Sequence, residues 1–117
     1  MSVTTGLKDL IRGDTKFINI ELKDKDGNPI DLTGSTIWFT LKENIKDPDT
    51  AAAIQKVITN HTDPTNGKTR IVLESSDTQD LQLGSYHYDI QLVDNGGNVT
   101  TVLIGRLKVL ADVTRSV

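Results

Sequence analysis

Polar and apolar residues alternate along most of the chain with the period of two that β-strands produce. The clearest run is Ser85–Val93, where large apolar residues occupy every second position and polar residues occupy most of the others. This pattern places one side of each strand in a core and the other side toward solvent. It predicts strands at Thr15–Lys23, Ser35–Lys42, Ile54–Thr59, Thr69–Glu74, Ser85–Val93, Asn98–Ile104 and Leu107–Leu110.

Turn-forming residues separate these strands. Asp24–Pro29 gathers Asp, Gly, Asn and Pro, and Asn95–Gly97 is a typical hairpin sequence. Polar residues interrupt Ile54–Thr59, which favours a place at a sheet edge. Gly105 predicts a bulge or bend between the last two segments. The longest helical pattern is a single turn at Ser76–Leu81.

These elements predict an all-β fold, an antiparallel Greek-key immunoglobulin-like β-sandwich of about seven strands. A length of 117 residues fits one domain. We place the sandwich at residues 13–114, with an N-terminal arm at residues 1–12 and a short tail at residues 115–117.

The N-terminal arm fits no strand period. Leu7, Leu10 and Ile11 stand there among polar residues. We expect the arm to be flexible, or to become ordered when it docks on a neighbouring protein. Leu7, Leu10 and Ile11 are therefore candidate interface residues.

Tyr86 is a candidate structural residue. It follows the predicted helical turn and stands near the start of the strand Ser85–Val93. The tyrosine corner of immunoglobulin-like domains has this layout, with a buried ring whose hydroxyl bonds backbone a few residues upstream. A tyrosine that only packs in the core would give the same sequence.

Charge and composition exclude several functions. The net charge is −3, and the 13 basic residues form no dense run of the kind that binds nucleic acid. The apolar runs are too short to span a membrane, and the first residues lack the pattern of a secretion signal. Because the chain has no cysteine, it has no disulfide, no thiolate metal ligand and no cysteine nucleophile. We expect no partnership with nucleic acid or membrane.

No set of residues predicts catalysis or metal binding. Ser85, His87 and Asp89 share one strand face, but their side chains run parallel and about 6.6 Å apart along the strand, unlike a hydrogen-bonded triad. Asp24–Asn28 lacks the later ligands of a calcium-binding loop, so turn formation explains it. Arg12–Asp14 spells an adhesion tripeptide without any supporting context. We predict a protein that is not an enzyme and needs no cofactor.

Two aromatic residues face away from the predicted core. Phe17 and Trp38 each lie between inward-facing apolar neighbours, so the alternation places both side chains on outer faces. An exposed aromatic side chain can anchor a protein contact or stack on a sugar ring, and it can also be covered by the protein's own loops. All three interpretations remain open for these candidate interface residues.

The chain also carries a series of turn and strand sequences in a particular order. They are Arg12–Thr15, Asp26–Gly34, Asp77–Thr78, Leu83–Leu92, Gly97–Val102, Gly105–Val109 and Asp112–Thr114. In this order they resemble the immunoglobulin-like structural domain of tailed phages and prophages. That family includes the N-terminal domain of the baseplate upper proteins of phages that infect Gram-positive hosts.

The resemblance implies a virion component of tail, baseplate or neck, made in the cytoplasm of the host bacterium. Such a protein works through contacts with other phage structural proteins and as a homo-oligomer, and the family has no catalytic residues to transfer. Larger relatives continue into receptor-binding segments beyond the point matched by Asp112–Thr114, which favours an adaptor, decoration or head–tail component here. The alternative is a carbohydrate-binding or adhesin-type β-sandwich, in which Trp38 and Phe17 stack on sugars.

Overall fold

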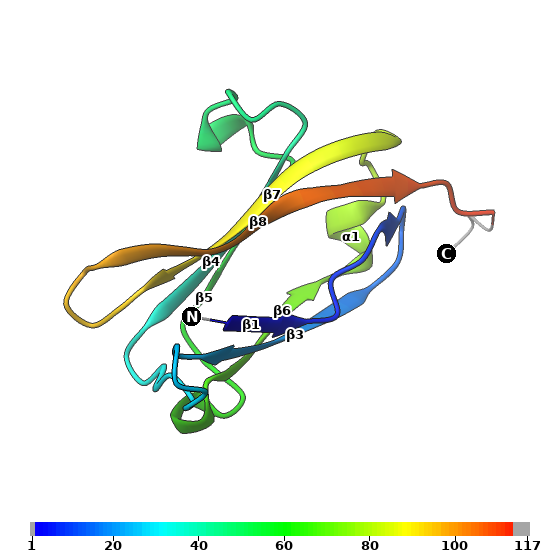
Figure 1. Cartoon of the computed structure of the whole chain (residues 1–117). Coiled ribbons are helices and arrows are strands. Elements are labelled where there is room, and N and C mark those ends of the chain that lie inside the picture. Colours follow the sequence, from blue (N-terminus) through cyan, green and yellow to red (C-terminus); the bar gives the residue numbers. More distant parts are fainter. Residues whose placement is uncertain (1, 114–117) are drawn as a thin grey trace.

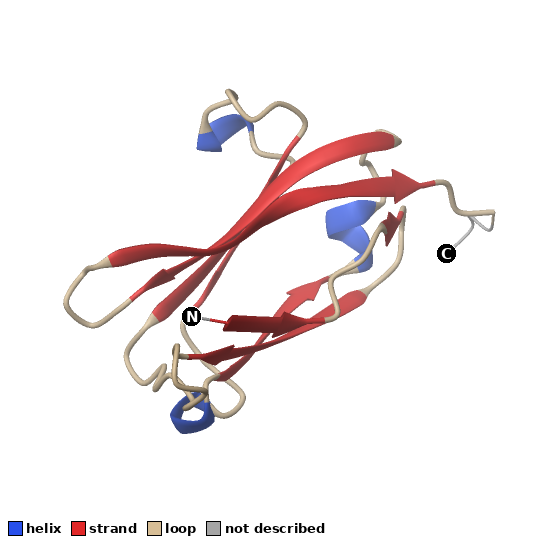
Figure 2. Cartoon of the chain, viewed as in Figure 1, coloured by secondary structure: helices blue, strands red, loops and turns tan. Residues whose placement is uncertain are grey.

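The computed structural model describes residues 2–113, and the predicted tail at residues 115–117 lies outside this range, as does Thr114. The described residues form eight strands and three short helices, so the protein is all-β (Figures 1 and 2). The strands are β1 (Ser2–Thr5), β2 (Leu10–Ile11), β3 (Lys16–Lys23), β4 (Thr36–Lys42), β5 (Ile54–Ile58), β6 (Lys68–Leu73), β7 (Gly84–Val93) and β8 (Val99–Leu110). The helices are η1 (Asp49–Ala51), η2 (Pro64–Asn66) and α1 (Ser75–Thr78).

Two sheets face each other in a sandwich (Figure 2). The smaller sheet has the strand order β1-β3-β6, and the larger has the order β2-β8-β7-β4-β5. All neighbouring strands run antiparallel except β2, which pairs in parallel with the end of β8. Because β5 lies at the edge of the larger sheet, the predicted edge position of this strand is confirmed.

The alternation in the sequence explains the core. Along β3, β4 and β7 the apolar side chains that share one face are buried, and their partners on the other face are half-buried or exposed. Phe39 and Tyr86 are the largest fully buried side chains. The inner faces of both sheets therefore meet in one continuous hydrophobic cluster.

The expectation of an N-terminal arm outside the sandwich is wrong for the described residues. Residues 2–5 form β1, which pairs with β3, and Leu10–Ile11 form β2, which pairs with β8. Leu10 is 1% exposed and belongs to the core, and Leu7 packs against that core. Both leucines stabilise this chain's own fold, so only Ile11 of the three candidate interface residues is freely exposed.

The last strand also differs from the prediction. Residues 99–110 form one long strand, and its irregularity falls where Ile90 pairs with Leu103 while Gln91 pairs with Thr101. Val102 is therefore the extra residue, and the bulge or bend predicted at Gly105 is absent. Gly105 pairs with Tyr88, whose ring would crowd any side chain at position 105, since a Cβ there would lie 2.9 Å from the Tyr88 hydroxyl.

An inward-facing charge protects the open edge of the larger sheet. Lys56 of β5 forms an ion pair with Asp77 of α1, with 2.9 Å between Nζ and Oδ2. Burial opposes ionisation of Asp77, but the hydrogen bonds from Lys56 and from the Glu74 backbone N–H lower its pKa below 3.8 overall. A lysine at an edge strand discourages pairing with the strand of another molecule.

Candidate functional site

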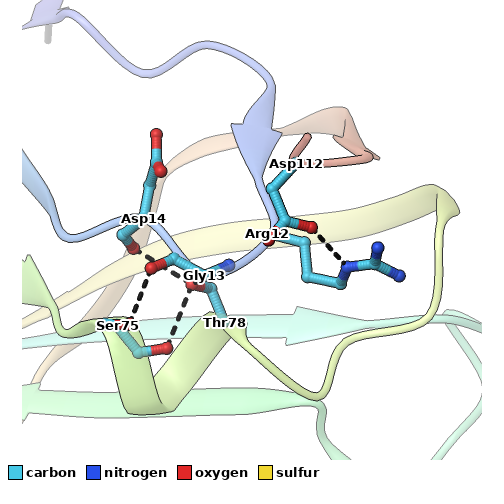
Figure 3. Close-up of polar contacts among 6 residues, drawn as sticks. All are labelled: Arg12, Gly13, Asp14, Ser75, Thr78 and Asp112. Carbon is cyan, nitrogen blue, oxygen red and sulfur yellow. Dashed lines mark hydrogen bonds and ion pairs between the residues drawn. The ribbon is translucent and has the colours of Figure 1, made fainter. Parts of the chain in front are cut away.

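Three distant segments meet at one end of the sandwich in what we call the terminal cluster (Figure 3). It consists of Arg12, Gly13, Asp14, Ser75, Thr78 and Asp112. The guanidinium Nε of Arg12 lies 2.9 Å from Oδ1 of Asp112, and both side chains are largely buried, at 18% and 14% exposure. The ion pair thus ties the segment around β2 to the end of β8.

Helix α1 holds the backbone of the same segment. The Thr78 hydroxyl accepts a hydrogen bond from the Gly13 backbone N–H at 2.9 Å and donates to the Asp14 carbonyl at 3.0 Å. Ser75 donates its hydroxyl to the Gly13 carbonyl at 2.6 Å. Gly13 has φ = 87°, a left-handed conformation that glycine adopts without strain.

The terminal cluster has a structural role. Because the Arg12 side chain pairs with Asp112 and α1 binds the Gly13 and Asp14 backbone, the tripeptide Arg12–Asp14 is not presented as an open adhesion loop. Three of the sequence signatures behind the family resemblance contribute to this cluster. Their order in the sequence did not show that they meet, because the contacts span 62 to 100 residues.

Tyr86 makes the predicted contact. Its ring is buried, and its hydroxyl donates a hydrogen bond of 2.6 Å to the backbone carbonyl of Gln82. Burial raises the pKa of Tyr86 above 10.0, and the negative charge of Glu43 adds a smaller effect in the same direction. The hydroxyl therefore stays protonated and acts as a hydrogen-bond donor. The contact fixes the turn that leads from α1 into β7.

The residues tested for catalysis or metal binding do not form such a site. Ser85, His87 and Asp89 lie at successive outward positions of β7, opposite Lys108, Arg106 and Ile104 of β8. The Asp24 carboxylate accepts hydrogen bonds from the backbone N–H groups of residues 26 and 28, at 2.9 and 3.0 Å, as turn formation predicts. Within residues 2–113, no group of three His, Asp or Glu side chains is placed to hold a metal ion.

A concave surface lies on the outer face of the larger sheet. We call it the Trp38 groove, a hollow of about 150 Å³ lined mainly by Trp38, Thr40, Gln55, Asp89, Gln91 and Ile104. These residues come from β4, β5, β7 and β8, and the pairing of those strands brings them side by side. Trp38 faces outward as predicted, and it is half-buried between Val57 and Gln91.

Polar side chains organise one side of the groove. Lys42 Nζ lies 2.8 Å from Oδ1 of Asp49, the first residue of η1. Gln55 donates its amide to Thr40 at 3.2 Å and to Asp49 at 3.3 Å. The hydrogen bond from Lys42 lowers the pKa of Asp49 below 3.8, and the hydrogen bond from Gln55 adds to this effect.

Asp89 is the least stabilised carboxylate of the groove. It accepts a long hydrogen bond of 3.4 Å from the Gln91 amide, which also reaches the Thr101 hydroxyl at 3.4 Å. Burial raises the pKa of Asp89 above 3.8, and the charge of Asp49 adds to this, while Lys42 and Gln91 oppose it. The carboxylate can therefore accept a stronger hydrogen bond than the one it has.

Phe17 lies outside this groove, on the outer face of the smaller sheet. Its side chain is 57% exposed, and the guanidinium carbon of Arg70 lies 5.5 Å from the ring centroid. Arg70 is held there by a hydrogen bond of 2.8 Å from Nε to Asn19. Phe17 and Trp38 thus face opposite sides of the sandwich and do not form one binding surface.

A second exposed surface is apolar and lies beside the terminal cluster. We call it the β2–β8 patch, formed by Ile11, Leu83 and Leu110, with exposures of 43%, 49% and 45%. Ile11 pairs with Leu110, and Leu83 precedes Gly84, which pairs with Val109. The sequence analysis singled out Ile11 alone, because Leu83 and Leu110 come beside it only through the pairing of β2, β8 and β7.

The comparisons with known proteins concern the fold. No family model and no curated protein matches the chain. The soluble domain of PmoD from Methylocystis sp. is similar in structure, with a TM-score of 0.51 and 8% identity over 92% of this chain and 88% of that one. A superoxide reductase (neelaredoxin) from Ignicoccus hospitalis aligns with a TM-score of 0.46 and 8% identity, covering 96% of this chain and 81% of that one. The PmoD likeness supports an all-β fold and nothing more specific.

Within residues 2–113, no helix has the length and apolar character needed to cross a membrane.

Proposed function

We propose that the sandwich is an immunoglobulin-like Greek-key domain. The neighbours β1-β3-β6 and β8-β7-β4 follow the order of strands A-B-E and G-F-C in immunoglobulin domains. The hydrogen bond from Tyr86 to Gln82 has the position and partner expected of a tyrosine corner, at the entry to the strand corresponding to F. These two observations are independent, since one is a topology and the other a side-chain contact.

We propose that the protein is a structural component of a tailed-phage virion, in the tail, baseplate or neck. It acts through contacts with other phage structural proteins and with copies of itself, and it performs no catalysis. The resemblance of residues 12–114 to the phage domain supports this function. The terminal cluster supports it further, because three of the signatures behind that resemblance hold one end of the sandwich rigid.

The observation that carries the proposal is the β2–β8 patch. Three apolar side chains gather at one end of the sandwich, each at least 43% exposed. An exposed apolar cluster on a small domain marks a surface for protein contacts. The ion pair of Arg12 with Asp112 and the hydrogen bonds from α1 fix the backbone beneath it. A rigid surface loses little conformational entropy when it binds.

The solution mass of the purified protein tests self-association through this patch. Light scattering over a concentration series is expected to give a closed oligomer, and the double substitution Ile11→Ser with Leu110→Ser is expected to return it to monomers. The matched control is Ile45→Ser with Val99→Ser, two side chains that are more exposed but lie elsewhere. A wild-type protein that stays monomeric at every concentration would show that the patch does not join copies of this chain.

A further inference from the structure

We propose that the Trp38 groove binds a neutral pyranose ring, one residue of a polysaccharide, with Trp38 against the C–H face of the sugar and Asp89 and Gln91 on its hydroxyls. This inference goes beyond the proposed function and does not depend on it. The groove lies on the outer face of the larger sheet, whereas the β2–β8 patch lies at the end of the sandwich. A virion component could use both surfaces at once.

The groove offers mainly hydrogen-bond acceptors to a ligand. The amide donors of Gln55 and Gln91 already bond Thr40, Asp49, Asp89 and Thr101 within the protein. Each glutamine amide retains a carbonyl oxygen, and Asp89 accepts one long bond where a carboxylate can accept several. The surface therefore suits a ligand with several donors, and the hydroxyl groups of a sugar are such donors.

Size and shape favour a single ring. A cavity of about 150 Å³ is large enough for one six-membered ring. The exposed side chains of Ile104, Ile45 and Val57 surround Trp38 with further apolar surface, at 66%, 59% and 48% exposure. A pyranose has an apolar C–H face and a polar rim, which matches an aromatic side chain with polar groups beside it. The groove opens onto the sheet surface, so the neighbouring residues of a polysaccharide can extend from either side.

The charges in the groove argue against an anionic ligand. Asp49 and Asp89 both line it, and the positive charge of Lys42 is paired with Asp49 at 2.8 Å. A carboxylate or phosphate would meet the charge of Asp89, and the one lysine of the lining, Lys42, is already paired, which leaves His87 as the remaining basic side chain. A neutral polyol avoids this repulsion and gains a charge-assisted hydrogen bond from its hydroxyl to the Asp89 carboxylate.

An organic cation is the other ligand that Trp38 and Asp89 could attract. Sites for such cations typically surround the charge with several aromatic faces. Here Trp38 projects from the outer face, and Tyr88, which also lines the groove, packs its ring against Phe39 with the two ring centroids 6.2 Å apart. Because the Tyr88 ring is engaged with Phe39, the aromatic side chains do not enclose a charge, and the hydroxyl and amide groups beside Trp38 suit a sugar better than a cation.

Nuclear magnetic resonance tests the site directly. The chain has one tryptophan, so a single indole N–H signal reports on the groove, and the side-chain amides of Gln55 and Gln91 report on its polar side. The probes are the methyl glycosides of glucose, galactose and N-acetylglucosamine, whose blocked anomeric oxygen stands for a glycosidic link. Titration to ~100 mM detects a Kd near ~10 mM.

Three variants make the test specific. Trp38→Leu is expected to abolish binding, and Asp89→Asn is expected to weaken it about fivefold, because a neutral hydrogen bond replaces a charge-assisted one. Phe17→Leu is the matched control, the same kind of substitution on the opposite face, and it is expected to bind as the wild type does. If Trp38→Leu fails to fold, Asp89→Asn still decides the result.

The expected outcome is a saturable shift of the indole and glutamine amide signals with at least one glycoside. The inference is overturned if no glycoside causes a saturable shift, or if Asp89→Asn binds as tightly as the wild type. It is equally overturned if tetramethylammonium binds more tightly than every glycoside, which would make the groove a cation site. None of these results bears on self-association, so failure here leaves the proposed function standing, and the reverse is also true.

Discussion

Removing one hydroxyl group from the terminal cluster tests whether that cluster holds the N-terminal segment in place. Thr78 is 1% exposed, and its hydroxyl bonds both the Gly13 N–H and the Asp14 carbonyl. The substitution Thr78→Val keeps the shape of the side chain and removes both hydrogen bonds. A buried donor left without a partner costs ~1–3 kcal/mol.

The expected loss of stability is at the middle of this range. Gly13 is half-buried, so its N–H loses most of its access to water, whereas Asp14 is exposed and its carbonyl regains a water partner. The net cost is then about 2 kcal/mol, allowing about 0.5 kcal/mol for the second bond. For a domain of this size we expect Tm to fall by roughly 8 °C.

Urea unfolding and native-state hydrogen exchange measure the effect. Thr4→Val is the matched control, because Thr4 faces outward on β1 and is exposed, and its substitution is expected to change stability by less than ~0.5 kcal/mol. In Thr78→Val, amides of residues 2–14 are expected to exchange faster than those of β4 and β7. If Thr78→Val and Thr4→Val were equally stable, the terminal cluster would not hold the segment.

Four further substitutions test other parts of the account. Tyr86→Phe removes the hydroxyl that bonds Gln82 and is expected to cost about 1 kcal/mol in urea unfolding, and an unchanged midpoint would show that only packing of the ring matters. Gly67→Ala is expected to cost more than ~2 kcal/mol, because φ is 71° and the new Cβ would overlap the Leu22 carbonyl oxygen. Gly27→Ala has a similar φ of 83° with no atom near its Cβ, so it should cost clearly less, and equal losses would rule out the steric argument. Asp89→Asn is expected to raise Tm at pH 7. Burial raises the pKa of Asp89 in the folded protein, so its contribution to stability is present below the unfolded pKa and lost as pH rises through the folded pKa. A Tm profile from pH 3 to 7 that is identical in both proteins would contradict this.

Local alternation was enough to predict most of the strands and the direction of their side chains. The predicted strand at Thr15–Lys23 is observed at Lys16–Lys23, with apolar residues inward, and Trp38 and Phe17 face outward as expected. The residues at 2–5 gave no such signal, because Val3 is their only apolar side chain. Strand β1 forms through its pairing with β3, which is a tertiary contact.

The irregularity in β8 also could not be predicted from the local alternation of polar and apolar residues. Val102, Leu103 and Ile104 form a continuous apolar run, so no break in the alternation marks Val102 as the extra residue. Gly105 looked like the place for a bulge, but it provides space for the Tyr88 ring on the neighbouring strand. A glycine in a strand has either meaning, and only the partner strand distinguishes them.

Both candidate surfaces depend on strand order, which the sequence did not give. The Trp38 groove joins Trp38 to residues of three other strands, and the β2–β8 patch joins Ile11 to Leu110 from the far end of the chain. His61 was also missed, since its role requires both sheets. Its ring lies 2.8 Å from the Thr69 hydroxyl of the smaller sheet and 2.7 Å from the Ser35 carbonyl next to β4.

The most direct test of the central claim is mass spectrometry of purified phage particles. Any phage particles in a lysate of cells that carry this gene would be separated on a density gradient and compared with the soluble fraction of that lysate. A virion component is predicted to sediment with the particles, in a fixed ratio to the major tail protein across independent preparations. If the protein is abundant in the soluble fraction and absent from the particles, it is not a virion component.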